Sequence, residues 1–113
     1  MSAEPYDFYL KNNDTSEAIE RELKDEDGNA EDLSTAVGVR FHMWKPDGTV
    51  VVDAAATFPN GGADGIARYT WDPSDTTEPG SYLAEFEVEV SAGQTETWPN
   101  HRDLQILIRD EGA

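Results

Sequence analysis

The chain has 113 residues and no cysteine, which is the size of one domain and excludes disulfides, thiolate metal sites and a cysteine nucleophile. Its 24 Asp and Glu against 8 Lys and Arg give a net charge of −16, and such a surface repels phosphate backbones and anionic lipids. We therefore expect neither nucleic acid nor a membrane as a partner, and the apolar runs are too short to predict a membrane span or a secretory signal.

The basic residues are unevenly divided, with only Lys11, Lys24 and Lys45 beside five arginines. Excess Asp and Glu with very little Lys resembles the composition of proteins from extreme halophiles. In molar salt the Debye length falls to about 3 Å, so the self-repulsion of such a surface is screened. The alternative is an acidic domain from a mesophile.

Five segments alternate apolar and polar residues with a period of two, the pattern of a β-strand with one buried and one solvated face. The clearest solvated face is the row Glu85, Glu87 and Glu89. The positions expected to face the core are, in chain order, Phe8 and Leu10; Val39, Phe41 and Met43; Ala67, Tyr69 and Trp71; Tyr82, Ala84, Phe86, Val88 and Val90; and Leu104, Ile106 and Ile108.

Residues 16–24 fit two structures when taken alone. The polar start at Asp14 is typical of a capped helix, but Ile19 and Leu23 suit one face of a strand equally well. Because predicted strands dominate the rest of the chain, we expect this segment to form a strand.

Turn residues separate the segments at intervals of about 8–12 residues, as in sandwiches and barrels. In the clearest turn, Pro46 presets φ and Gly48 takes the position that needs a positive φ. The sequence thus predicts an all-β, immunoglobulin-like antiparallel β-sandwich, as a single domain over residues 1–113 with its core at about 6–109. The expected shared core consists of Phe41, Tyr69, Trp71, Tyr82, Phe86 and Ile106.

A Pro79-Gly80-Ser81-Tyr82 sequence leads directly into the longest alternating segment. A Tyr at the start of a late strand, just after a Gly turn, is typical of the tyrosine corner of immunoglobulin-like sandwiches. We expect the Tyr82 hydroxyl to bond back to the preceding loop.

An ordered series of short motifs spans roughly residues 6–109. Its main members are Phe8-Tyr9-Leu10-Lys11, Asp27-Gly28-Asn29, Val39-Arg40-Phe41-His42-Met43, Pro46-Asp47-Gly48, Gly65-Ile66-Ala67-Arg68-Tyr69, Pro79-Gly80-Ser81-Tyr82-Leu83-Ala84-Glu85-Phe86 and Thr97-Trp98-Pro99-Asn100. The series resembles the N-terminal domain of the phage baseplate upper protein family, and together with the acidic composition it implies a tailed virus of a haloarchaeon. The resemblance implies an immunoglobulin-like attachment module of a virus tail. Family members often continue into a receptor-binding or multimerising region, whereas this chain stops after the domain, which favours a connector.

No motif for catalysis or cofactor binding is present in the sequence. His42 and His101 are far apart and are expected on the surface, and neither a HExxH, a GxSxG nor a phosphate loop occurs. The acidic loop 25–32 lacks the Gly and the bidentate Glu of a calcium loop, since Ala30 and Ala36 stand at those positions. We expect no enzyme activity, no cofactor and no dedicated metal site, and a non-specific cation at this loop remains an alternative.

Two aromatic residues, Tyr9 and Trp44, fall on the outward positions of their strands. Large aromatics are favoured interface anchors, although packing under a loop is the alternative for both. We therefore expect a non-catalytic structural protein located in a virion, in the tail or baseplate. Its expected partners are other virion structural proteins and copies of itself. The alternatives are a cell-surface or carbohydrate-binding immunoglobulin-like module and an accessory domain of a cytosolic enzyme.

Overall fold

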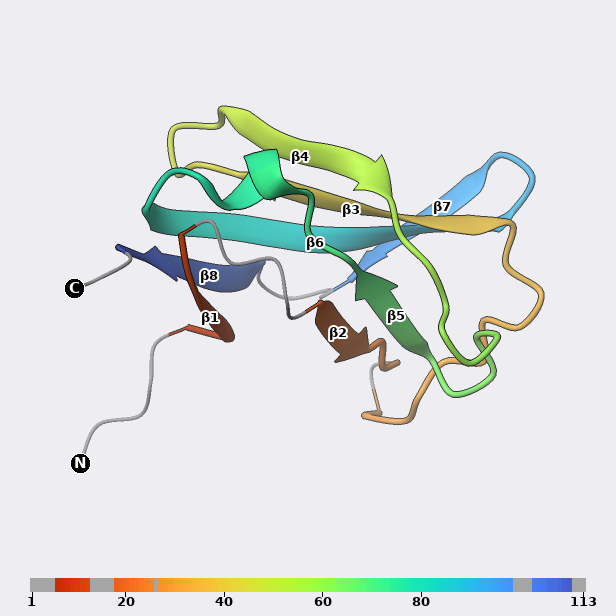
Figure 1. Cartoon of the computed structure of the whole chain (residues 1–113). Helices are drawn as coiled ribbons and strands as arrows, with labels where there is room; N and C mark the ends of the chain where they lie inside the picture. The colour runs from red at the N-terminus through yellow and green to blue at the C-terminus, as the bar shows by residue number, and fades with distance from the viewer. Residues whose placement is uncertain (1–5, 13–17, 26, 99–102, 111–113) are drawn as a thin grey trace.

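A computed structural model describes residues 6–12, 18–25, 27–98 and 103–110, which form an all-β, immunoglobulin-like sandwich (Figure 1). The only helical element in these ranges is a 3₁₀ turn, η1 (Pro73–Thr76). Within these ranges, no helix is long and apolar enough to cross a membrane. The strands are β1 (Phe8–Lys11), β2 (Ile19–Glu22), β3 (Gly38–Trp44), β4 (Val50–Ala55), β5 (Ile66–Tyr69), β6 (Gly80–Ser91), β7 (Gln94–Trp98) and β8 (Leu104–Arg109).

The strands form two layers of unequal width. The larger sheet has the order β1-β8-β6-β3-β4, and β7 pairs with the far part of β6, while the smaller sheet is the antiparallel pair β2-β5 (Figure 1). The pairs within the larger sheet are antiparallel except for β1 and β8, which run parallel. These two strands come from opposite ends of the chain, so no hairpin sets their relative direction. The expected antiparallel sandwich is therefore present, with one parallel pair at its edge.

The segment with two possible structures is a strand in its described part. Ile19 is fully buried and pairs with Tyr69 of β5, and Leu23 is buried just after the strand ends. Residues 13–17 lie outside the described residues. The strand is favoured because β5 supplies the backbone partners and the core accepts both apolar side chains.

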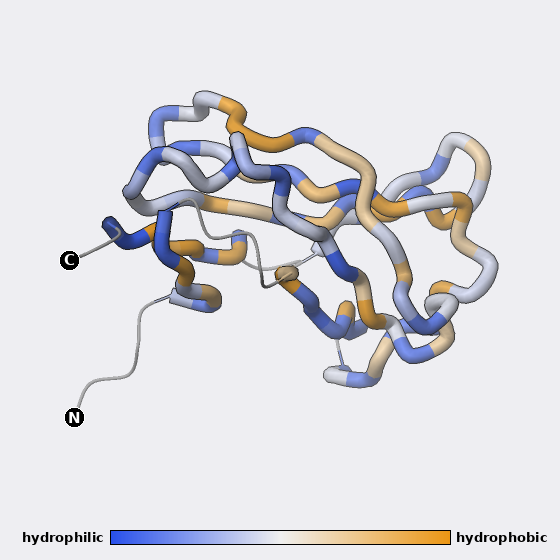
Figure 2. Tube along the Cα trace, in the orientation of Figure 1, coloured by the Kyte–Doolittle hydropathy of each residue, from blue (hydrophilic) through white to orange (hydrophobic). Residues whose placement is uncertain are grey.

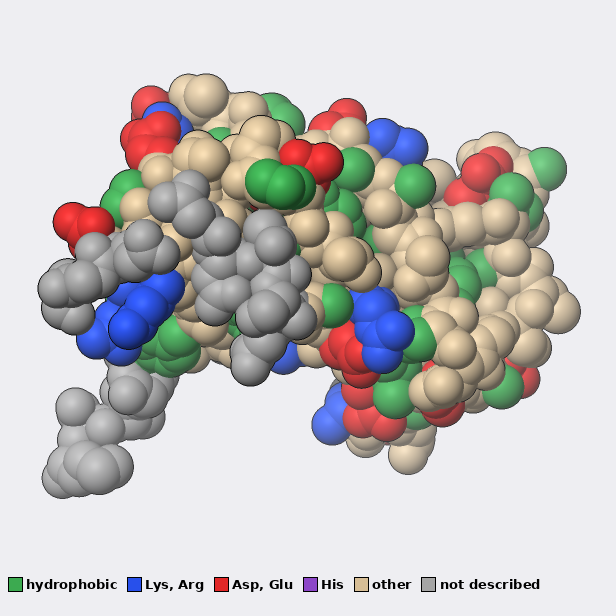
Figure 3. Space-filling view, viewed as in Figure 1, with side chains coloured by type: hydrophobic (Ala, Val, Ile, Leu, Met, Phe, Trp, Pro, Cys, Tyr) green, Lys and Arg blue, Asp and Glu red, His purple; other side chains and the backbone are tan. Residues whose placement is uncertain are grey.

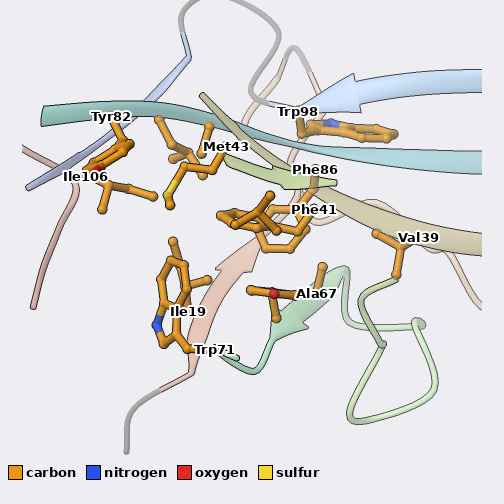
Figure 4. Packing of buried hydrophobic residues seen from close by; sticks show 14 of the residues in the cluster. Ile19, Val39, Phe41, Met43, Ala67, Trp71, Tyr82, Phe86, Trp98 and Ile106 are labelled. Atoms are coloured by element: carbon orange, nitrogen blue, oxygen red, sulfur yellow. The ribbon is translucent and has the colours of Figure 1, made fainter. Parts of the chain in front are cut away.

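All six residues expected in the shared core are buried in one cluster between the two sheets. Phe41 lies at its centre, with its ring 4.8 Å from that of Tyr69, 5.1 Å from that of Phe86 and 5.7 Å from that of Trp71 (Figure 4). Hydropathy alternates along the central strands, as the period-two pattern requires (Figure 2).

The turn between β3 and β4 has the expected chemistry. Gly48 has φ +95°, and its N–H donates to the carbonyl oxygen of Lys45 at 2.8 Å. The carboxylate of Asp47 accepts from the N–H of Thr49 at 2.9 Å, which lowers the pKa of Asp47 below its ordinary value. A side chain at position 48 would be strained at this φ.

The tyrosine corner is confirmed. The Tyr82 hydroxyl donates to the carbonyl oxygen of Glu78 at 2.6 Å, across the loop that precedes β6. Burial raises the pKa of Tyr82 above its ordinary value, and the nearby Glu78 carboxylate raises it further. The hydrogen bond fixes the loop that carries the chain from η1 to β6.

Replacing Tyr82 with Phe is expected to lower the free energy of unfolding by about 1 kcal/mol, because one hydrogen bond is lost while the ring stays in place. Urea denaturation at fixed salt measures this difference. Tyr6→Phe is the matched control, because its hydroxyl bond to Ser81 is exposed. Equal effects of the two substitutions would show that the corner does not stabilise the fold.

Candidate docking face

The outer face of the larger sheet carries both aromatic residues that the sequence analysis singled out as interface anchors. Tyr9 lies between the core-facing Phe8 and Leu10, and Trp44 follows the buried Met43. Both side chains are half-buried. The structure thus places Tyr9 on β1 and Trp44 on β3, on the same face but near opposite edges of the sheet.

Aliphatic side chains connect these two aromatics across the sheet. Tyr9 pairs with Leu107 of β8. Trp44 pairs with Leu83 of β6 on one side and with Val50 of β4 on the other. Leu107 and Leu83 are diagonal neighbours, because Leu107 pairs with Ser81, two residues before Leu83. We call Tyr9, Leu107, Leu83, Trp44 and Val50 the apolar band. Its most exposed member is Val50, at 65%.

The β1 end of the apolar band is extended by Tyr6. Its ring meets that of Tyr9 edge to face, with centroids 5.7 Å apart, and its hydroxyl lies 2.7 Å from the Ser81 hydroxyl. Edge-to-face aromatic pairs are favourable and rigid. Two tyrosines therefore present a preorganised surface at this end.

A charged cluster lies beside the apolar band on the same face. The two ring nitrogens of His42 lie 3.3 Å from the carboxylates of Asp53 and Glu85, and Glu87 is 3.9 Å away. Arg40 reaches Asp53 at 3.0 Å. We call His42, Asp53, Glu85 and Glu87 the His42 cluster. His42 is thus on the outer face, as expected, but it is half-buried among carboxylates.

Two cations lie on the other side of the apolar band. Lys11 follows Tyr9 by two residues, Arg109 follows Leu107 by two, and the two cations are register partners on β1 and β8. Both are exposed, and Figure 3 shows Lys and Arg side chains gathered where β1 and β8 lie. Within the described ranges, no ion pair involves the side chain of either residue. We call Lys11 and Arg109 the cation pair.

In the acidic loop 25–32, the carboxylate of Asp25 is used within the loop itself. The Asp25 carboxylate accepts from the N–H groups of Asp27 and Asn29, both at 2.9 Å, so it shapes its own loop. No group of three or more His, Asp or Glu in the described part of the chain is arranged to hold a metal ion. His101 lies outside the described residues.

The β1 and β4 edges of the larger sheet are poor templates for strand addition. The register shifts between Met43 and Trp44 where β3 pairs with β4, and β1 has only four residues. Bulges and short edge strands are devices that hinder pairing with another chain. The broad outer face is therefore the better candidate for docking than either edge.

Sequence reasoning found the two aromatic members of the apolar band and missed Leu83, Leu107, Val50 and Tyr6. A signal existed for the two leucines, because both occupy outward positions of alternating strands. Val50 begins a run of three valines without alternation, and Tyr6 precedes the strand, so neither gave such a signal.

No protein-family model matches the chain, and no curated protein matches it. Among solved structures, the chain is similar to CopC from Methylosinus trichosporium OB3b, with a TM-score of 0.54 and 12% identity over 93% of this chain and 85% of that chain. It also aligns with alpha-2-macroglobulin from E. coli (21% identity, TM-score 0.44) and from Salmonella (19%, 0.44), over 92% of this chain but only 6% of those chains. The likeness to CopC supports the sandwich fold alone.

Proposed function

We propose that this chain is a non-catalytic structural module that works by docking its outer face on other proteins of a virus particle. The observation that carries the docking role is the apolar band, which crosses five strands from Tyr9 to Val50. The setting, the tail or baseplate of a haloarchaeal virus, rests on the motif resemblance and on the acidic composition.

The chemistry of the band suits a protein contact. Aromatic and aliphatic side chains held on a sheet bury much area at little entropic cost, and depletion of charge is typical of interface centres. In a chain of net charge −16, a surface without carboxylates is where two proteins can approach with least repulsion.

The test uses the structural proteins encoded beside this reading frame, which we expect to include tail-assembly proteins. Each is purified and its affinity for this chain is measured in 2 M NaCl. We expect one partner to bind, and Trp44→Ala or Tyr9→Ala to weaken that binding at least ~10-fold, as for interface anchors.

Val37→Ala is the matched control, since Val37 is 63% exposed but lies in the loop before β3, outside the apolar band. Folded Trp44 and Tyr9 variants that bind as well as the control would show that these anchors are wrong. Turnover of a glycan or ester by the purified chain would overturn the non-catalytic role.

A further inference from the structure

We infer that the outer face docks on the same face of a second copy of this chain, giving a two-fold dimer. This inference rests on the proposed docking function and names its partner. In such an isologous contact each surface must be complementary to itself. The outer face meets this requirement in both hydrophobicity and charge.

Among the residues that the structure describes, the cation pair is unusual because no carboxylate forms an ion pair with either side chain. Each of the other Lys and Arg side chains that the structure describes contacts a carboxylate or a carbonyl oxygen: Arg21 with Asp7 and Glu20, Lys24 with Glu22, Arg40 with Asp53, Lys45 with Glu78, and Arg68 with Glu20. Two adjacent, exposed cations without an ion-pair partner in the described ranges, in a chain of net charge −16, favour a carboxylate-bearing partner.

The register places the two kinds of charge on opposite sides of the apolar band. On β8, Arg109 lies two residues beyond Leu107, and Lys11 lies beside it on β1. On β6, Glu85 lies two residues beyond Leu83, toward the opposite end of the sheet. The order along the strands is therefore cation pair, apolar band, His42 cluster. This order runs from positive through neutral to negative.

A second copy turned face to face, by half a turn about an axis through the apolar band, satisfies both charge groups at once. The cation pair of each copy then lies over Glu85 and Glu87 of the other, and the two bands meet between them. These carboxylates are available for the contact, since the side chains of Glu85 and Glu87 are 24% and 33% exposed.

The size of the molecule is sufficient for this contact. Its two longest dimensions are 43 and 34 Å, and a stable contact needs about 800 Å² on each partner. The net charge of each copy opposes association at low salt, so we expect the dimer to strengthen as salt screens the long-range repulsion.

Sedimentation equilibrium in 1 M NaCl tests the inference with the full chain. We expect the parent to show a dimer mass, and Leu83→Lys at the centre of the band to weaken the dimer at least ~10-fold. Val37→Lys adds the same charge outside the band and is expected to leave the dimer unchanged. A parent that remains monomeric, or a Leu83→Lys variant that dimerises as well as Val37→Lys, overturns the inference.

A charge swap tests the orientation. The double variant K11E/R109E and the double variant E85K/E87K should each dimerise weakly alone, because like charges then face each other. Mixed together they should form a heterodimer at least ~10-fold tighter than either homodimer, since both charge contacts are restored. Melting curves first establish that each variant folds, and E87K alone replaces E85K/E87K if that variant does not. No gain on mixing overturns the proposed orientation.

The same variants separate this inference from the proposed function. If the chain is monomeric but Trp44→Ala still weakens binding to another particle protein, self-pairing is wrong and the docking function stands. If the dimer forms as described but no particle protein binds, the self-pairing stands and the proposed function in the particle is wrong.

Discussion

Phe86→Ala is expected to lower the free energy of unfolding by about 3–5 kcal/mol, the cost of a large cavity in a packed core. Phe86 is fully buried in β6, its ring lies 5.1 Å from that of Phe41, and its register partners are Phe41 on one side and Trp98 on the other. Both neighbours are held by their own strands, so they cannot collapse into the space. Domains of this size have only about 5–15 kcal/mol of stability, so the variant is expected to be close to unfolding.

Urea denaturation at fixed salt measures the loss. Phe86→Leu keeps most of the volume and is expected to cost less than half as much, and Thr97→Ala, on the exposed part of β7, is expected to change stability by less than about 0.5 kcal/mol. If Phe86→Ala lowers the free energy of unfolding no more than Thr97→Ala does, Phe86 is not packed in the core. The side chains of Glu85, Glu87 and Glu89 could then not be the solvent-facing side of β6.

The core could be predicted from the sequence because period-two alternation is a local signal. It identified the inward positions of β3, β5, β6 and β8 without any knowledge of which strands are neighbours. The tyrosine corner was equally local, since Tyr82 and Glu78 are four residues apart.

Two strands gave no such signal. β4 begins with Val50, Val51 and Val52, and its pairing with β3 contains a register shift, so its burial does not alternate cleanly. Four of the five residues of β7 are exposed, so burial does not alternate along this strand. Its last residue, Trp98, is buried, and its indole N–H donates to the carbonyl oxygen of Lys24 at 3.0 Å.

The candidate face could be predicted only in part. The alternation of residues placed Tyr9 and Trp44 on the outward side of their own strands. Their place in one band depends on the parallel pairing of β1 with β8 and on the position of β6 between β8 and β3. These pairings join residues far apart in the sequence, about a hundred positions in the case of Tyr9 and Leu107. No local pattern encodes them, so the continuity of the band and the flanking charges emerged only from the fold.

The melting temperature of the isolated domain is expected to rise by roughly 10 °C between 0.1 and 1 M NaCl. The cause is the net charge of −16 confined to a domain with a radius of gyration of 14.3 Å. Like charges about 20 Å apart in water repel by about 0.2 kcal/mol a pair, and 16 excess charges form about 120 such pairs (16 × 15 / 2). At 0.1 M, where the Debye length is about 10 Å, roughly 3 kcal/mol of this repulsion remains, and at 1 M almost none does.

Thermal unfolding followed by circular dichroism across a NaCl series measures this rise. Glu96→Lys is the matched variant, because Glu96 is exposed on β7 and the substitution removes two units of net negative charge. It should melt higher than the parent at 0.1 M and gain less from added salt, since fewer like charges remain to be screened. An effect of salt on protein hydration alone would shift parent and variant equally. A parent whose melting temperature is flat or falls above 0.1 M would contradict adaptation to high salt and favour an acidic domain that folds at ordinary ionic strength.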